Sequence, residues 1–263
     1  MSTLTHTKSY SAETGTKPLQ ILFPDPRNHK FADWLEFDGY HYPAKDIISL
    51  GDSLSVSNLK EAYLKGVFPW HIDGLPLPWF CPEMRAILQF SSLHIPASLK
   101  KLRKNNKMTF TLDRDFHSVI RQCADSERPT QDGTWITEEF VAAYLELHRE
   151  GLAHSVEVWD EGGNLVGGLY GVDAGGVFCG ESMFFLRPNA SKLALMFLID
   201  HLVSRGSQWM DIQVMTPHME KLGAIEIHRD EFLSKLSDTQ RQDRKSTRLN
   251  SSHSSVSRMP SSA

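Results

Sequence analysis

The sequence predicts an α+β fold in which a mostly antiparallel sheet is flanked by helices. Three strand-like segments, His154–Trp159, Leu165–Tyr170 and Val177–Phe184, follow one another and are joined by glycine-rich turns typical of hairpins. A helix comes next; its apolar residues recur at spacings of three and four, and Gly206 ends it. One more strand, Trp209–Met215, alternates polar and apolar residues. This succession forms the centre of the expected fold, and we also expect the chemistry there.

The composition is that of an ordinary soluble globular protein. The 263 residues are 40% hydrophobic and 23% charged, enough for one large domain or two small ones. No apolar run is long enough to span a membrane, and the polar N-terminus lacks the apolar core of a secretory signal. Three widely spaced cysteines, Cys81, Cys123 and Cys179, argue against a disulfide scaffold and against a metal site. We therefore expect a cytoplasmic protein without membrane contact.

Changes in composition divide the chain into four parts. Residues 1–18 are polar and aperiodic, and residues 238–263 are serine-rich without an apolar period, so we expect both to be disordered. The C-terminal segment looks like translated vector sequence and is excluded from the functional interpretation. Between these segments we expect a small N-terminal α/β domain at 19–93 and a larger C-terminal domain at 94–237.

In the N-terminal domain, an amphipathic helix precedes a cluster of aromatic residues and prolines. Asp52, Ser53 or Ser55 is expected to cap the helix, and Gly66 to end it. The cluster runs from Val67 to Pro82. Such a cluster either fills a small core under a loop or forms a rigid wall, and the sequence leaves both open.

A basic helix is predicted at the start of the larger domain, within residues 95–107. Its cations are Lys100, Lys101, Arg103, Lys104 and Lys107. Because the formal net charge of the chain is −4, a nucleic acid would have to bind through such a local patch. A solvated helix face is the alternative interpretation of the same pattern.

Two further helices are expected before the hairpins. The first covers Phe116 to Cys123, with Asp113 or Asp115 as its cap. The second covers Thr137 to Glu150 and begins with a capping box at Thr137. Trp135 lies in the polar turn between them, where it is either a core residue or a platform for a base.

The strand that follows the central helix carries a polar pair. Alternation with period two places Asp211 and Gln213 side by side on one face of that strand. A carboxylate can orient and partly deprotonate an ammonium group, and a neighbouring amide can hold the amine or an ester oxygen. An exposed strand face without a catalytic role is the alternative for a lone pair of this kind.

Several stretches together resemble one family, the leucyl/phenylalanyl-tRNA–protein transferases of bacteria. They are LKEAYLKGVFPW (59–70), TWITEEFVAAYLELHREGLAHSVEVW (134–159), LVGGLYGV (165–172), GESMF (180–184), RPNASKLAL (187–195) and DIQVMTPHMEKLGA (211–224). They cover nearly everything from residue 50 to residue 236, in order. Two stretches depart from the pattern: 50–52 reads Leu-Gly-Asp, and 81–85 reads Cys-Pro-Glu-Met-Arg.

The resemblance implies a fold, an activity and a set of partners. The C-terminal domain would have the acetyltransferase-like (GNAT) fold, and the protein would move Leu or Phe, and less readily Met, from aminoacyl-tRNA to the N-terminal Arg or Lys of an acceptor protein. That transfer would mark the acceptor for the N-degron pathway. The resemblance also implies that Asp211 and Gln213 are catalytic and that Glu181 lies at the cleft.

The remaining expected site residues bind the aminoacyl end of the charged tRNA and its phosphates. The substrate-binding set is Trp70, Trp135, Phe178, Glu181, Met183, Asn189, Ser191, Leu195 and Met210. Within it, the two tryptophans would stack on the terminal adenine, and the apolar residues with their adaptable methionines would accept the Leu or Phe side chain. The cations from Lys100 to Lys107 would contact tRNA phosphates.

No cofactor is expected. Acetyltransferases of this fold bind the coenzyme A pyrophosphate at a glycine-rich turn before a helix, whereas the turn at 187–192 has no glycine. We expect a monomer. Three alternatives stay open at the sequence level: a related transferase acting on acidic N-termini or peptidoglycan, an acyl-CoA transferase, and a tRNA-binding module without activity.

Overall fold

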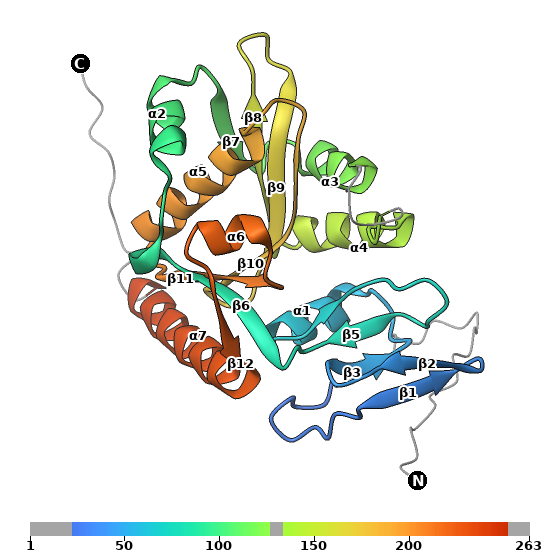
Figure 1. Ribbon diagram of the computed structural model, residues 1–263. Coiled ribbons are helices and arrows are strands. Elements are labelled where there is room, and N and C mark those ends of the chain that lie inside the picture. Colours follow the sequence, from blue (N-terminus) through green and yellow to red (C-terminus); the bar gives the residue numbers. More distant parts are fainter. Residues whose placement is uncertain (1–22, 127–133, 252–263) are drawn as a thin grey trace.

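The centre of the molecule is a seven-stranded sheet. The computed structural model describes residues 23–126 and 134–251, with side chains as far as Arg244. The strands of the sheet are β6 (Met84–Gln89), β7 (Thr109–Leu112), β8 (Ala153–Trp159), β9 (Leu165–Asp173), β10 (Phe178–Phe185), β11 (Trp209–Gln213) and β12 (Ile225–His228). Their order is β12-β6-β11-β10-β9-β8-β7, and every neighbouring pair is antiparallel except β10 with β11 (Figure 1). The expected α+β fold with a mostly antiparallel sheet is confirmed.

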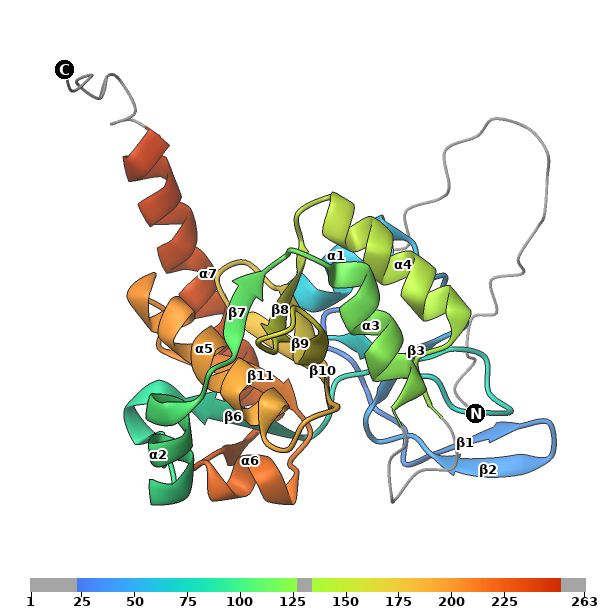
Figure 2. The same cartoon turned by 90° about the horizontal axis from the view of Figure 1, so that it is seen from above.

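Helices cover both faces of this sheet and close two hydrophobic cores. On one face lie α1 (Val56–Leu64), α3 (Phe116–Asp125) and α4 (Glu138–Arg149); on the other lies α5 (Ala190–Ser204), with α2 (Ala97–Asn105) and α6 (Pro217–Lys221) beside it (Figures 1 and 2). Consecutive strand residues belong to different cores: Cys179 packs with the α3 and α4 side, and Phe178 with the α5 side. This alternation is what a sheet buried on both faces requires.

The helices begin where the sequence indicates. The Thr137 side chain accepts a hydrogen bond from the Phe140 N–H at the start of α4. Asp115 caps α3 through the Ser118 N–H. Ser55 caps α1 in the same way. Each cap satisfies an amide of the first turn that has no partner within the helix.

The N-terminal unit contains two small sheets. A hairpin pairs β1 (Trp34–Phe37) with β2 (Tyr40–Pro43), and a second sheet has the order β3 (Ile47–Leu50), β5 (Pro78–Phe80), β4 (Phe68–Pro69). Trp79 and Phe68 are buried almost completely. The aromatic and proline cluster therefore fills a core here, as one of the two sequence interpretations has it.

The expected domain boundary after Leu93 cuts the large sheet. Residues 84–89 form β6, which pairs with β11 on one side and β12 on the other. Local alternation identifies a strand, but it carries no information about which sheet the strand joins. We therefore place the boundary just before Met84.

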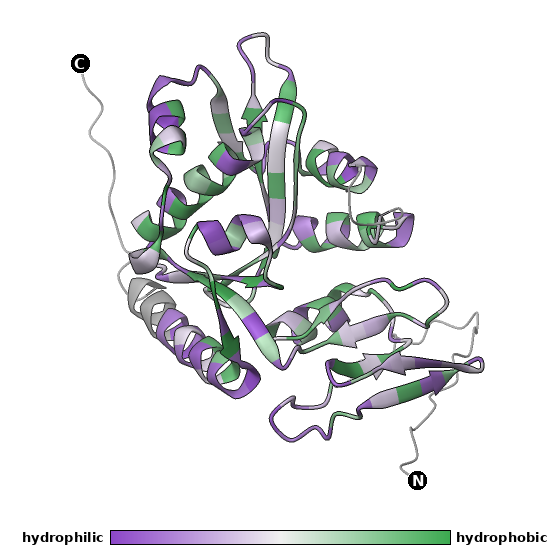
Figure 3. Ribbon diagram, in the orientation of Figure 1, coloured by the Kyte–Doolittle hydropathy of each residue, from purple (hydrophilic) through white to green (hydrophobic). Residues whose placement is uncertain are grey.

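The expectation of a disordered C-terminal tail is wrong for residues 238–251. They continue α7 (Arg229–Ser251), and the part of this helix that is coloured in Figure 3 is mostly hydrophilic. The buried Gln240 side chain donates hydrogen bonds to the carbonyls of Leu64 and Ala174. A contact made by a polar side chain such as Gln240 adds no apolar period to the sequence, so the composition of this segment does not indicate that it packs on the protein. The other predicted disorder, at 1–18 and 252–263, lies outside the described residues.

Among the helices within the described ranges, none is long and apolar enough to cross a membrane.

Candidate active site

The candidate site lies where β10 and β11 part. The two parallel strands pair only at Cys179 with Asp211. Each strand also carries an irregularity: the register of β10 shifts between Gly180 and Ser182, and that of β11 shifts between Asp211 and Gln213. Such bulges re-aim side chains and are common beside active sites. Here they turn Glu181 and Gln213 toward each other.

Gln213 has a strained backbone. Its φ is +64°, and the Val214 N–H donates a 2.7 Å hydrogen bond to the Ile212 carbonyl across it, which makes a three-residue turn. A left-handed conformation at a residue other than glycine costs about 1–3 kcal/mol and persists only where the surroundings enforce it. Asp211 and Gln213 are neighbours, as the sequence predicts, but the turn rather than strict alternation produces the arrangement.

Asp211 is buried inside the protein, where it pairs with Arg85. Its carboxylate is fully buried; Oδ1 accepts from Arg85 Nε at 2.9 Å and Oδ2 from Arg85 Nη2 at 2.7 Å. Oδ1 also accepts from the Gln213 N–H at 2.9 Å. Burial opposes the charge of Arg85, yet the adjacent carboxylate raises the pKa of this guanidinium. Asp211 thus faces no solvent, and its predicted contact with the incoming amine stays a prediction.

The Arg85 guanidinium lies between two aromatic rings. Its centre is 4.5 Å from the ring centre of Phe68 and 4.6 Å from that of Phe232. In the sequence, Arg85 lies in a stretch that departs from the family pattern, and nothing there links it to Asp211. Its partner Asp211 is 126 residues away, so no local spacing connects the two.

Glu181 is the carboxylate that remains partly exposed. Its Oε1 accepts from Gln213 Nε2 at 2.5 Å and its Oε2 accepts from the Tyr144 hydroxyl at 3.3 Å. The Tyr144 hydroxyl in turn lies 2.5 Å from that of Tyr63 on α1. Burial raises the pKa of Glu181 to about 7, against a lowering by the tyrosine and glutamine hydrogen bonds. A carboxyl group with this pKa exchanges protons readily near neutral pH.

The expected substrate-binding residues are divided between the two faces of the sheet. Phe178, Leu195 and Met210 are nearly fully buried in the α5-side core, and Met183 packs against them with part of its surface exposed. Glu181, Gln213 and Asp211 contact groups of the opposite core. At the start of α5, Ser191 is buried and Asn189 adopts φ +68° without capping the helix through its side chain.

The two tryptophans expected to hold adenine stack on each other. The ring centres of Trp70 and Trp135 are 5.1 Å apart, with 26° between the planes. Trp135 is buried and also meets Phe140 edge-on, whereas Trp70 is partly exposed. Both lie on the α4 side, the side of Glu181.

All five cations of the basic stretch are exposed. Arg103 forms an ion pair with Asp200 of α5, and Lys107 forms one with Glu161 at 3.1 Å. The other three, Lys100, Lys101 and Lys104, have no ion-pair partner within the part of the chain that the structure describes. Unpaired exposed cations are free to meet phosphates.

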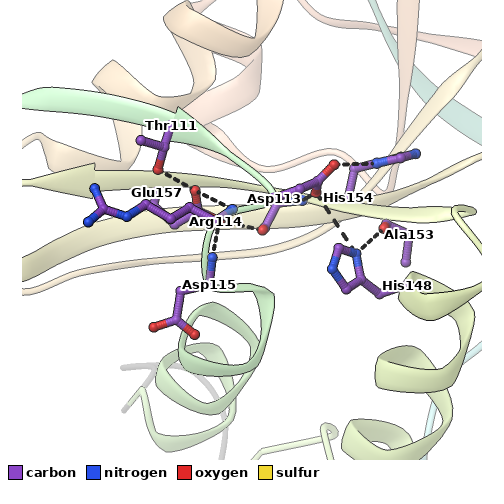
Figure 4. Close-up of polar contacts among 9 residues, drawn as sticks. Thr111, Asp113, Arg114, Asp115, His148, Ala153, His154 and Glu157 are labelled. Atoms are coloured by element: carbon purple, nitrogen blue, oxygen red, sulfur yellow. Dashed lines mark hydrogen bonds and ion pairs between the residues drawn. The ribbon is translucent and has the colours of Figure 1, made fainter.

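A second polar cluster was not predicted. Asp113, at φ +55°, lies 2.7 Å from His154 Nδ1 and raises the pKa of this histidine through that hydrogen bond (Figure 4). Next to it, the fully buried Glu157 accepts hydrogen bonds from the backbone N–H groups of Arg114 and Asp115. These contacts fix the corner between β7 and α3.

A pocket of about 970 Å³ opens beside this cluster. Asp113, His154 and Trp209 contribute to its lining, and α7 closes one side. Strand β11 begins at this pocket with Trp209 and ends with Gln213. The pocket therefore lies at the other end of the strand from the candidate active site.

Comparison with known proteins points to one family. The family model "Leucyl/phenylalanyl-tRNA protein transferase" matches residues 87–237, and the model of that family's N-terminal domain matches residues 52–83. A leucyl/phenylalanyl-tRNA–protein transferase of Oleidesulfovibrio alaskensis is 43% identical over 221 residues, which are 82% of this chain and 84% of the relative. One from a Shewanella species is 47% identical over 199 residues, covering 76% of this chain and 83% of the relative.

Among solved structures, the chain resembles a GCN5-related N-acetyltransferase from Sphaerobacter thermophilus. The sequence identity is 13%, the TM-score is 0.35, and the likeness covers 66% of this chain and 54% of that one.

Proposed function

This chain belongs to the leucyl/phenylalanyl-tRNA–protein transferase family, and from that premise we propose that it moves Leu or Phe, and less readily Met, to the N-terminal Arg or Lys of acceptor proteins. It is an aminoacyltransferase that uses aminoacyl-tRNA and a protein acceptor. The product would carry an N-terminal residue that marks it for the N-degron pathway.

The observation that carries this assignment is the Glu181–Gln213 pair at the opening between β10 and β11. The acceptor's N-terminal amine binds between the Glu181 carboxylate and the Gln213 side-chain carbonyl. An acceptor that begins with Arg or Lys brings its positive charge beside this carboxylate, which supports the basic class of acceptor.

The transfer then needs little activation, because an ester is already reactive toward an amine. The amine nitrogen bonds to the ester carbonyl carbon, and the bond from that carbon to the tRNA ribose oxygen breaks. In passing from ammonium to amide the nitrogen loses two protons. One ends on the ribose oxygen, which leaves as a hydroxyl, and the other goes to Glu181 and from there to water. The pKa of Glu181, about 7, suits this role.

The tRNA is held at its terminal adenosine and at its backbone. We assign the adenine to the indole faces of Trp70 and Trp135; a base inserted between them has to separate the present stack. We assign the Leu or Phe side chain to Met183, which packs on the α5-side core with part of its surface exposed. Phe178, Leu195 and Met210 are buried behind it and would have to move to admit that side chain, with Asn189 and Ser191 at the start of α5. The exposed cations of the α2 region contact phosphates, which makes binding weaker as salt rises.

We propose that the protein is a monomer and that it acts in the cytoplasm, where charged tRNA and newly exposed N-termini are both present. The alternatives of a silent binding module and of an acyl-CoA transferase are not favoured by the family to which the chain belongs.

Transfer of radiolabelled leucine from Leu-tRNA to a protein with N-terminal Arg tests the proposal. We expect transfer by the natural chain and a loss of roughly 100-fold or more in kcat for Gln213→Ala, with tRNA binding retained. Gln208→Ala, an exposed glutamine just before β11, is the matched control and should keep full activity.

Two outcomes would contradict the assignment. Transfer to Asp or Glu termini, with none to Arg or Lys, would move the protein to a different acceptor class. Full activity of Gln213→Ala would show that the Gln213 amide takes no part in the reaction.

A further inference from the structure

We propose that Arg85 is a positioning residue of the transfer reaction: it clamps Asp211, and Asp211 holds the Gln213 backbone in the left-handed turn that presents the Gln213 side chain to Glu181. This inference rests on the proposed function of the Glu181–Gln213 pair. It assigns Asp211 to the support of Gln213 rather than to proton transfer.

Within the described part of the chain, the side-chain hydrogen bonds of Arg85 go to one partner, Asp211. Arg85 is almost completely buried, and its Nε and Nη2 both bond to Asp211. Its third nitrogen, Nη1, has no hydrogen-bond partner among the groups that the structure describes. A buried guanidinium with an unsatisfied nitrogen is costly, so two parallel bonds to a single carboxylate are its stabilising interaction here.

The clamp fixes the direction of the carboxylate. Two parallel bonds prevent the Asp211 carboxylate from rotating, and Oδ1 therefore stays 2.9 Å from the Gln213 N–H. The rings of Phe68 and Phe232 on either side of the guanidinium prevent Arg85 from swinging out of the plane of this contact.

The fixed position of the Gln213 backbone N–H determines where the Gln213 side chain points. In a relaxed strand Gln213 would leave φ +64°, and its Nε2 would lose the contact with Glu181 Oε1. The sequence of contacts is therefore Arg85 to Asp211, Asp211 to the Gln213 N–H, and the Gln213 side chain to Glu181. The Asp211 carboxylate is fully buried, and each of its oxygens accepts a hydrogen bond from Arg85.

Arg85→Lys is the first test. Lysine keeps the charge but offers a single point of attachment, so the carboxylate can rotate. We expect kcat for leucine transfer to fall roughly 10- to 100-fold, while KM for Leu-tRNA stays within about twofold. The control is Arg229→Lys, which changes another buried arginine stacked on an aromatic ring, Phe31, without contact to Asp211. It should keep the natural kcat even where it lowers the melting temperature.

Arg85→Gln combined with Asp211→Asn is the second test. The amide introduced at position 211 can still accept from the Gln213 N–H, and the amide introduced at position 85 can pair with it without charge. If Asp211 only positions Gln213, the kcat of the double variant is at least about tenfold higher than that of Asp211→Asn, because no buried charge is left unpaired. If Asp211 itself takes a proton, the double variant stays as inactive as Asp211→Asn.

The outcomes separate this inference from the proposed function. A natural chain that transfers leucine, together with an Arg85→Lys variant of unchanged kcat, overturns the positioning role alone. An inactive double variant that melts like the natural protein overturns it as well. Where the double variant does not fold, the kcat of Arg85→Lys decides. A natural chain with no transfer to any acceptor instead overturns the proposed function.

Discussion

At the scale of single residues, Glu181 places a charge where the protein environment disfavours it. Burial raises the pKa of this carboxyl to about 7, so the folded protein binds the proton more tightly than the unfolded chain does. The contribution of Glu181 to stability is accordingly most favourable at low pH, and it is lost as the pH rises from about 4.5 through 7.

Replacing the carboxyl by an amide removes this dependence. Glu181→Gln is expected to melt at the same temperature as the natural protein at pH 5 and at least about 2 °C higher at pH 8, because no charge is then buried. Thermal unfolding at the two pH values measures the difference. A variant that melts lower at pH 8 would show that the hydrogen bonds to the carboxylate outweigh the cost of its burial.

The sequence predicts Asp211, Gln213 and Glu181 as candidate site residues, but not the groups that hold them in place. Asp211, Gln213 and Glu181 were expected because their motifs are local. Arg85 and Tyr144 were missed, since each meets its partner across a long stretch of chain: 126 residues for Arg85 and 37 for Tyr144. An arginine in a strand and a tyrosine on a helix face are ordinary features until the fold brings them to a carboxylate.

At the scale of elements, the sequence located helices well and strand irregularities poorly. The helix caps at Ser55, Asp115 and Thr137 obey local rules and appear in the structure. The bulges at Glu181 and Ile212 depend on how two strands pair, which alternation within one strand cannot express.

The contact between α5 and β9 is a close one that depends on glycine. A Cβ atom at Gly167 would lie 2.5 Å from the Cβ of Ala190, at the first turn of α5, and 3.2 Å from its carbonyl carbon. We expect Gly167→Ala to lower the free energy of unfolding by about 1–3 kcal/mol, because the helix start has to move away from the sheet.

Urea unfolding measures this cost, and Gly162→Ala is its control. Gly162 lies in the β8–β9 turn, where an added Cβ meets only the side chains of Asn164 and Asp160. It should change stability by less than about 0.5 kcal/mol. Equal effects of the two substitutions would mean that α5 does not rest on Gly167.

At the scale of the whole molecule, α7 joins parts that are far apart in the chain. Near its start, Arg229 donates to the carbonyls of Lys45 and Pro82 in the N-terminal unit. Further along, Gln240 reaches Leu64 of α1 and Ala174 in the turn between β9 and β10. The helix thus fastens the N-terminal unit to the large sheet at two points.

Gln240→Ala is expected to destabilise the protein by about 1–3 kcal/mol, because two carbonyls lose their donor. Ending the chain after Ser237 should cost at least as much. Arg241→Ala removes an exposed side chain that forms an ion pair with Asp238; it is the control and should be nearly neutral. Chemical denaturation compares the three; an unaffected truncated chain would mean that residues after Ser237 do not help to hold the fold.

The position of β6 has a consequence for synthesis on the ribosome. The residues of this strand are synthesised early, yet those of both of its neighbours, β11 and β12, follow more than 100 residues later. At a translation rate of about 5–20 residues per second, its two edges wait roughly 5–30 s for partners. Its apolar run Ala86–Leu88 is then open to pairing with other nascent chains. The sheet at the centre of this protein can therefore close only after β12 has been made, and the yield of folded protein depends on what shields β6 until then.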